Sequence, residues 1–310
     1  MKNIFTLIIL LSSFFSFGQI TIVNGTCQCP NATVGDTDVI NGTTYTAVDN
    51  STIAGQIANG NVNLCTTLVT NMSSLFAGNS SFNSDISFWD TSNVTTMGDL
   101  FQSADAFNQD ISGWNVSNVT NMNNTFKYAR SFNQNIGGWD VSSVINMSVM
   151  FTEADDFNQD IGNWDVSNVS NMFAMFNSAN VFNQDITGWC VSNISSIPSQ
   201  FSSTALTDAN KPLWGKEFKV ALTGGSLSQT VTATNAITNI VHTVTPICAG
   251  SITASVGGLP SGVSLAFANN VATISGSANA TGTSNYRLAF FINPATSETI
   301  QSVTGTITVQ

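Results

Sequence analysis

The chain has few charged side chains. Charged residues make up 8% of its 310 residues, and seven basic residues stand against eighteen acidic ones, which gives a formal net charge of -11. Nucleic acids and anionic membrane surfaces attract proteins through clusters of Lys and Arg. We therefore expect neither of them as a partner. An acidic, Lys-poor surface also keeps an exported protein soluble, so the charge by itself indicates no particular ligand.

The residues of common catalytic centres are missing too. His242 is the single histidine, and the sequence has no Gly-x-Ser-x-Gly motif and no phosphate-binding loop. Acid pairs such as Glu153 with Asp155 or Asp156 leave a two-carboxylate glycosidase open on residue counts alone. No Trp or Tyr is free beside them to form a sugar subsite. We expect no enzymatic activity and no cofactor.

Cysteines are few, and their number is odd. In an exported chain, five cysteines allow disulfides but leave at least one sulfur without an internal partner. Cys27, Cys29 and Cys65 are the disulfide candidates, with one bridge joining the N-terminal segment to the first repeat. Their spacing lacks the paired ligands of a zinc site, so we expect no metal. For Cys190 and Cys248, pairing across two domains, pairing between chains and free thiols all stay open.

The chain does contain a repeat of 25 residues. Every tryptophan follows this step, and so do a methionine and two phenylalanine columns. The columns are Trp89, Trp114, Trp139, Trp164, Trp189 and Trp214; Met72, Met97, Met122, Met147 and Met172; Phe76, Phe101, Phe126, Phe151, Phe176 and Phe201; and Phe82, Phe107, Phe132, Phe157 and Phe182. One unit buries too little apolar surface to fold alone, so neighbouring units must stack into a shared core.

The apolar spacing inside one unit predicts two kinds of local structure. Met122, Phe126 and Ala129 fall on one helical face, which predicts a short helix or helical turn. Residues 114–116 alternate with a period of two, which predicts a short strand. Repeating this order gives a solenoid with a parallel sheet along one side.

A family resemblance follows from these motifs. The repeat resembles the BspA-type leucine-rich repeat of bacterial surface proteins in two respects. One is the spacing of Ile111, Trp114, Val116, Val119, Met122, Phe126, Ala129 and Phe132, and the other is the sequence motif Phe-Asn-Gln-Asp-Ile-x-x-Trp-Asp-Val-Ser-Asn-Val. The resemblance covers residues 64–214. It implies a leucine-rich-repeat-like solenoid, a place at the bacterial surface and, in some relatives, attachment to host matrix proteins or neighbouring cells.

The remaining segments complete the predicted domain organisation. Residues 1–19 are typical of a secretory signal peptide, because a lysine precedes an apolar run that is short for a membrane span. Residues 20–63 are predicted to cap the solenoid of residues 64–217. Residues 218–310 have evenly spaced candidate strands and predict an all-β sandwich. The turns around Gly258-Leu259-Pro260 and Gly282-Thr283 resemble immunoglobulin-like domains of bacterial surface proteins. We expect a secreted or cell-surface protein without a membrane span after signal removal.

Two polar columns are candidates for function. Asp90, Asn115, Asp140 and Asp165 follow the tryptophans and should point outward from the sheet, which makes them candidate binding residues. A second ladder consists of Asp85, Asp110, Asn135, Asp160 and Asp185, beside Asn83, Asn108, Asn133, Asn158 and Asn183. Its oxygens suit calcium, but we expect them to satisfy backbone groups of the turns instead.

The function expected from these observations is binding or adhesion. The repeats would act as a scaffold for an extracellular protein or glycan. One alternative is a carbohydrate-binding accessory module, although Phe88 is the only clear outward aromatic residue among the strand positions. Another alternative is a structural component of a surface layer, which would associate with itself.

Overall fold

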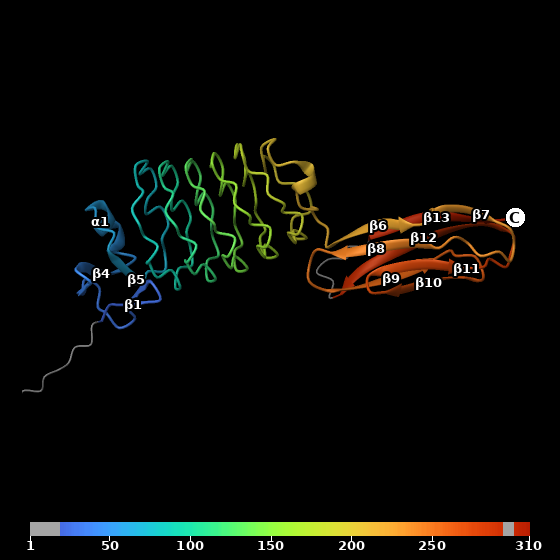
Figure 1. The fold of residues 1–310 in the computed structure, drawn as a ribbon, viewed down its shortest axis with the longest axis horizontal. Helices are drawn as coiled ribbons and strands as arrows, with labels where there is room; N and C mark the ends of the chain where they lie inside the picture. Colours follow the sequence, from blue (N-terminus) through green and yellow to red (C-terminus); the bar gives the residue numbers. More distant parts are fainter. Residues whose placement is uncertain (1–18, 294–300) are drawn as a thin grey trace, which may run out of the picture.

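A computed structural model describes residues 19–293 and 301–310 of the chain. The predicted signal peptide lies outside these residues, except for residue 19. Figure 1 shows two parts that follow one another along the long axis: a stack of coils and, at the C-terminal end, a pair of sheets. Strands account for 31% of the structure and helices for 3%. We call residues 69–214 the repeat stack.

The N-terminal segment forms two small sheets that cover the first repeat. Their elements are β1 (Thr21–Val23), β2 (Thr26–Gln28), β3 (Thr37–Ile40), β4 (Thr43–Asp49), α1 (Ile53–Ala58) and β5 (Leu64–Leu68). β1 pairs antiparallel with β2, while β4 lies between an antiparallel β3 and a parallel β5. Asn41 and Gly42 join β3 to β4 with φ angles of 51° and 83°. Asn and Gly tolerate this left-handed backbone, which is typical of a two-residue hairpin turn.

Hydrogen bonds between successive repeats hold the backbone of the repeat stack. The N–H groups of alternate residues donate to carbonyls of the next repeat: Met122 to Asn146, Asn124 to Ser148, Phe126 to Met150 and Tyr128 to Thr152, at 2.9 to 3.0 Å. Short parallel bridges link Asn71, Thr96, Asn121, Asn146 and Asn171 in the same way. Each coil therefore relies on its neighbours for its backbone partners.

The predicted helix in each repeat is wrong, and the backbone shows why. Asn124 and Tyr128 have φ angles of 54° and 60°, and the equivalent residues of the neighbouring repeats are also left-handed. A left-handed residue in each tight turn stops an α-helix from continuing. The spacing of Met122, Phe126 and Ala129 still places them on the inner side. Bonds to the next repeat have replaced the bonds that a helix would make within itself.

The predicted strand at residues 114–116 is also wrong. Trp114 N–H donates to the Ile111 carbonyl, and Val119 N–H donates to the Val116 carbonyl, so tight turns flank this segment. The structure therefore does not show the predicted leucine-rich-repeat-like solenoid of helix-plus-strand units. The fold class is corrected to an almost all-β protein with several sheets, in which the repeats are coils joined by isolated bridges.

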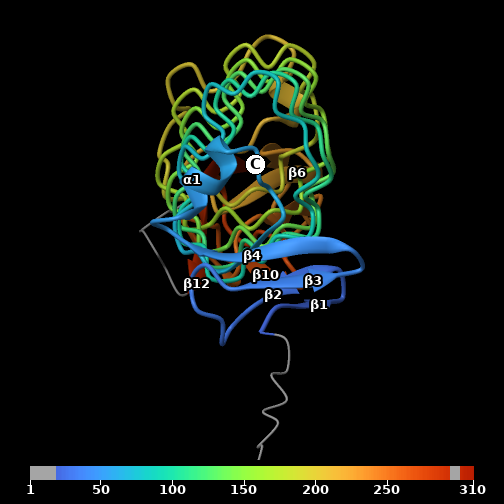
Figure 2. The same cartoon turned by 90° about the vertical axis from the view of Figure 1, so that its left-hand side faces the viewer.

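The apolar columns fill the inside of the coils, which lie over one another in Figure 2. The phenylalanine and tryptophan columns form ladders of stacked rings. Phe101 and Phe126 lie 5.6 Å apart between centroids, and Phe126 lies 4.0 Å from Phe132 of its own repeat. Such pairs add about 0.5–1.5 kcal/mol each to the burial of the rings. The indoles of Trp114, Trp139, Trp164 and Trp189 also donate to the preceding repeat, as Trp139 Nε1 does to the Ile111 carbonyl at 3.1 Å.

The part after the repeat stack consists of two four-stranded sheets around a second core. We call these two sheets, from β6 to β13, the sheet pair. A 3-10 helix, η1 (Asp208–Asn210), precedes it. The strands are β6 (Phe218–Gly224), β7 (Ser228–Val231), β8 (Ile240–Pro246), β9 (Ser251–Gly257), β10 (Val263–Ala268), β11 (Val271–Gly276), β12 (Gly282–Asn293) and β13 (Gln301–Val309). One sheet has the order β10-β11-β8-β6 and the other β7-β13-β12-β9. Among the described residues of these two sheets, β7 and β13 pair in parallel and the other neighbouring strands pair antiparallel.

Candidate binding surface on the repeat stack

The candidate binding residues lie at one corner of successive coils. We call Asp90, Asn115, Asp140 and Asp165 the Asp140 column. Asn115, Asp140 and Asp165 are exposed, as the sequence predicts, but they lie between tight turns and not on the face of a sheet. Successive coils lie roughly 4.8 Å apart where parallel bridges join them. The column is therefore a short row of polar side chains along the repeat stack.

One side-chain oxygen of each column residue is fixed by its own turn. Asp140 Oδ1 accepts hydrogen bonds from the Ser142 N–H at 3.1 Å and from Ser142 Oγ at 2.6 Å. Asn115 Oδ1 accepts the equivalent pair from Ser117 at 3.1 and 2.7 Å. The bond from the Ser142 hydroxyl, followed by that from its N–H, holds the pKa of Asp140 below its usual value. Asp140 is consequently ionised at neutral pH.

Asp90 departs from this exposed arrangement. Its residue is only 5% exposed, because the N-terminal segment covers this end of the column. Asp90 Oδ2 accepts a hydrogen bond from Thr67 Oγ1 at 2.8 Å, and the Cys27 N–H donates to the Phe88 carbonyl next to it. The prediction of an outward-facing Asp90 is corrected: only Asn115, Asp140 and Asp165 are accessible.

The second polar ladder makes structural hydrogen bonds. Asn133 Oδ1 accepts from the Asn158 N–H at 3.0 Å and from Gln159 Nε2 at 2.9 Å. Asn83, Asn108, Asn158 and Asn183 repeat this bond to the backbone of the following repeat. Asp85, Asp110, Asn135, Asp160 and Asp185 each accept from the N–H two residues later. Among the described residues, no group of three His, Cys, Asp or Glu is placed to hold a metal ion.

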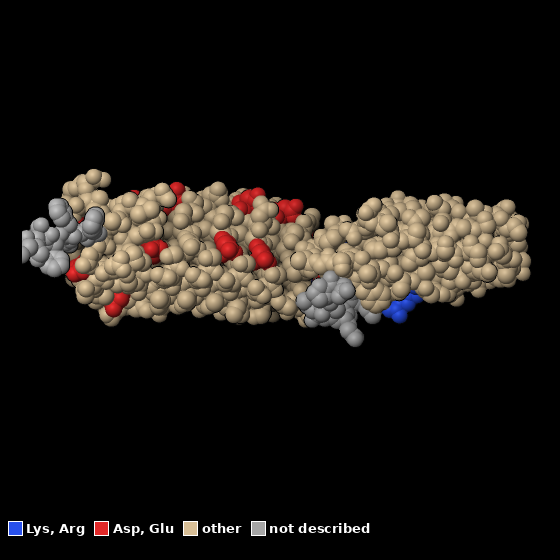
Figure 3. Space-filling model, turned by 90° about the horizontal axis from the view of Figure 1, so that it is seen from below, with Lys and Arg blue, Asp and Glu red and all other residues tan. Residues whose placement is uncertain are grey.

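Negative charge is concentrated on the repeat part of the chain. Residues 64–217 contain fourteen acidic and four basic residues. The described residues of the sheet pair contain Lys219 and Arg287 and no acidic residue. Figure 3 shows this difference on one face, with acidic side chains along the repeat stack and a basic group on the sheet pair. A cationic partner would therefore be drawn to the repeat stack.

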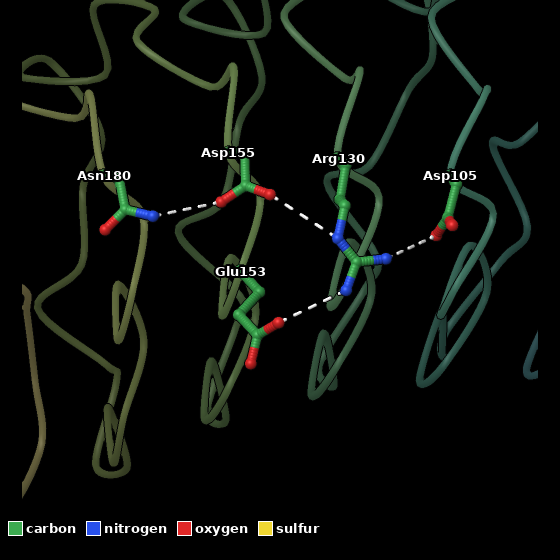
Figure 4. Close-up of polar contacts among 5 residues, drawn as sticks. All are labelled: Asp105, Arg130, Glu153, Asp155 and Asn180. Carbon is green, nitrogen blue, oxygen red and sulfur yellow. Dashed lines mark hydrogen bonds and ion pairs between the residues drawn. The ribbon is translucent and has the colours of Figure 1, made fainter.

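One arginine sits within the acidic repeats. Arg130 contacts Asp105 at 3.2 Å, Glu153 at 3.3 Å and Asp155 at 3.5 Å, so that it joins three successive repeats (Figure 4). Asn180 Nδ2 extends the row by donating to Asp155 at 3.2 Å. These side chains are about half exposed, and exposed ion pairs contribute little to stability. Glu153 and Asp155, one of the acid pairs that residue counts left open for glycosidase chemistry, are therefore both engaged with Arg130.

The cysteines tie both ends of the repeat stack. Cys29 and Cys65 form a disulfide near the first coil, and Cys190 and Cys248 join the last coils to the sheet pair. Cys27, the third disulfide candidate, is a buried free thiol. Burial, with a contribution from the charge of Asp90, raises its pKa from 9.0 to about 12. A thiol that stays protonated at neutral pH is a poor nucleophile.

The outward aromatic residue that the sequence predicts is in contact with the N-terminal segment. Phe88, the predicted outward aromatic residue, packs edge-on against Tyr45 of β4 with 5.5 Å between the ring centroids. The N-terminal segment thus occupies the ring that a sugar would stack against.

No helix among the described residues is long and apolar enough to cross a membrane.

A comparison with known families places the chain. The model of a family described as "Mycoplasma protein of unknown function, DUF285" matches residues 46–144 and 113–214. Together the matches span more than half of the chain, which therefore belongs to this family. The leucine-rich-repeat description is corrected to membership of this family, because no BspA or leucine-rich-repeat family model matches and the described residues show no helix-plus-strand units. No curated protein matches the chain. Membership assigns no activity, since the family's function is unknown.

Proposed function

We propose that the chain is an exported binding protein, secreted or held at a bacterial cell surface, whose Asp140 column contacts an extracellular protein. The observation that carries this proposal is the fixed, charged column. Asp140 and Asp165 use Oδ1 in their own turns, and their Oδ2 atoms have no partner among the described residues. A partner can bind these oxygens without first ordering them, which lowers the entropic cost of association.

The charge of the column indicates the chemistry of the partner. Carboxylates on neighbouring coils, roughly 4.8 Å apart, repel each other by about 1 kcal/mol even in water. A Lys or Arg placed between Asp140 and Asp165 would relieve this repulsion. A protein surface with basic groups therefore fits the column better than a neutral glycan. The two disulfides support an oxidising location, since such bonds persist mainly outside the cytosol.

Binding to immobilised extracellular-matrix proteins and glycans tests this proposal. The test variant is Asp140→Asn with Asp165→Asn, because Asn115 shows that asparagine makes the same turn in this column. A matched control is Asp99→Asn with Asp156→Asn, which removes the same charge elsewhere on the repeat stack. We expect the test variant to lose at least about tenfold in affinity for a protein ligand, or about 1.4 kcal/mol, and the control to bind normally.

Three results would contradict the proposal. Equal losses in both variants would show that net charge, and not the Asp140 column, attracts the ligand. Binding to glycans alone, unaffected by either variant, would favour a carbohydrate-binding module. If the chain binds neither the matrix proteins nor the glycans and associates with itself in light scattering, a structural surface component would be favoured.

A further inference from the structure

A cleft lies where the repeat stack meets the sheet pair. Its volume is about 570 Å³, which is within the usual range of small-molecule sites. Three segments that are distant in sequence line it: the turn after Asp185, the segment from η1 to Leu213, and the adjoining ends of β6 and β8. Junctions between structural units are frequent places for ligand sites.

Covalent and hydrogen bonds fix the walls of this cleft. Gly188 and Ile247 both line the cleft, and each lies within two residues of the disulfide between Cys190 and Cys248. The N–H groups of Ile247 and Cys248 both donate to the Glu217 carbonyl at 2.9 Å. The repeat stack and the sheet pair are thus tied together beside the cleft. A ligand would meet a site that is already formed, which reduces the cost of binding.

The cleft contains two of the chain's few lysines. Lys219, on β6, is exposed and has no ion-pair partner among the described residues. Lys211 pairs with Asp208 at 2.9 Å, although the Asp208 side chain is 99% exposed while that of Lys211 is 19% exposed. Because its carboxylate is almost fully exposed, solvent screens this pair and weakens it. A ligand carboxylate would therefore compete with Asp208 for Lys211, and Lys219 lines the same cleft.

The other residues that line the cleft suit a ligand that has hydroxyl groups and an apolar face. Asp185 Oδ1 accepts from the Thr187 N–H at 2.9 Å and from Thr187 Oγ1 at 2.7 Å, which fixes the carboxylate and leaves Oδ2 as an acceptor. Leu213 and Ile247 add apolar surface. A fixed acceptor beside an apolar wall matches a sugar ring, which has hydroxyl edges and carbon faces.

We propose that this cleft binds a small carboxylate of about monosaccharide size, with Lys219 and Lys211 holding its carboxyl group. The carboxylate belongs to an acidic sugar or to the C-terminus of a peptide, since the lysines recognise the same group in both. The site is separate from the Asp140 column. If the cleft binds no carboxylate, the proposed protein-binding function is unaffected. If the Asp140 column binds no protein, the proposal for the cleft is unaffected.

Calorimetric titration of the mature chain tests the cleft with three probes. Glucuronate carries the carboxylate on a sugar ring, glucose is its neutral counterpart, and N-acetylglycine represents a peptide terminus. We expect glucuronate to bind at least about tenfold more tightly than glucose, which corresponds to about 1.4 kcal/mol. Rising salt should weaken this binding, because the charges are exposed to solvent. Tighter binding of N-acetylglycine would support the same site with a peptide as the source.

A pair of lysine variants locates the binding. Lys219→Gln should weaken glucuronate binding at least about tenfold. Lys216→Gln is the matched control, because Lys216 is exposed, lies three residues away and does not line the cleft. Asp140→Asn with Asp165→Asn should leave this titration unchanged. The proposal is overturned if neither carboxylate binds, if glucose binds as tightly as glucuronate, or if both lysine variants lose affinity equally.

Discussion

The asparagine ladder gives a direct test of how the coils are held together. Asn133 lies in a central repeat, and its Oδ1 accepts two hydrogen bonds from the next one, from the Asn158 N–H and from Gln159 Nε2. Its own amide nitrogen donates no hydrogen bond among the described residues. Each accepted bond contributes about 0.5–1.5 kcal/mol net. Asn133→Ala should therefore lower the free energy of unfolding by about 1–3 kcal/mol.

A second substitution separates the oxygen from the rest of the side chain. Asn133→Asp keeps the size and the acceptor oxygen and replaces the unused nitrogen by a second, charged oxygen, and we expect a change within about 0.5 kcal/mol. Urea unfolding followed by tryptophan fluorescence measures both variants. All six tryptophans lie in the repeat stack, so the signal reports on this part of the chain alone.

The comparison between the variants decides the outcome. If Asn133→Ala is as stable as the wild type, the ladder does not hold the coils. If Asn133→Asp loses as much stability as Asn133→Ala, the amide nitrogen or the neutral charge matters, and the hydrogen-bond assignment is wrong. The slope of the free energy of unfolding against urea concentration should be the same in the wild type and both variants, since a changed slope would indicate a different extent of unfolding.

Three further predictions concern single positions. Val149 has a left-handed backbone with a φ of 62°, and Asn124 is the equivalent residue one repeat earlier. Because Asn tolerates this conformation better than a β-branched residue, Val149→Asn should stabilise the repeat stack by about 1 kcal/mol in urea unfolding. Asn124→Val should destabilise it by a similar amount. Arg130→Gln should change the free energy of unfolding by less than about 1 kcal/mol despite its three ion pairs, and a larger loss would show that the row acts as a network. His242 is buried and has no hydrogen-bond partner among the described residues, and burial lowers its pKa below 6.5, so the unfolded chain takes up the proton first. Its contribution to stability is full above pH 6.5 and is lost as the pH falls below that value, by up to about 1.4 kcal/mol per pH unit. His242→Phe should remove this dependence in unfolding followed by circular dichroism between pH 7.5 and 5, and an unchanged pH profile would contradict the assignment.

The inside of the repeat stack is readable from sequence because each coil presents the same side chains at the same places. The tryptophan, methionine and phenylalanine columns of the sequence are the buried core, from Met72 to Phe201. A step of 25 residues in six tryptophans requires equivalent environments, whatever the local backbone does. The structural role expected for the asparagine ladder likewise agrees with the hydrogen bonds that its oxygens accept.

The backbone within each coil was decided by tertiary structure. Met122, Phe126 and Ala129 have helical spacing, but neighbouring coils supply hydrogen-bond partners that an isolated segment lacks, and left-handed residues such as Asn124 complete the turns. Local spacing cannot distinguish these two ways of turning the same side chains inward.

Sequence by itself therefore determined the repeat length, the buried columns, the acidic charge and the shortage of catalytic groups. Only the tertiary structure buried Asp90 under the N-terminal segment, chose Cys29 over Cys27 as the partner of Cys65, and joined Cys190 to Cys248. It also brought Lys211 and Lys219 to one cleft. The physical reason is distance along the chain: a repeat encodes its contacts with the next copy, whereas contacts at the ends of the stack join segments that share no pattern.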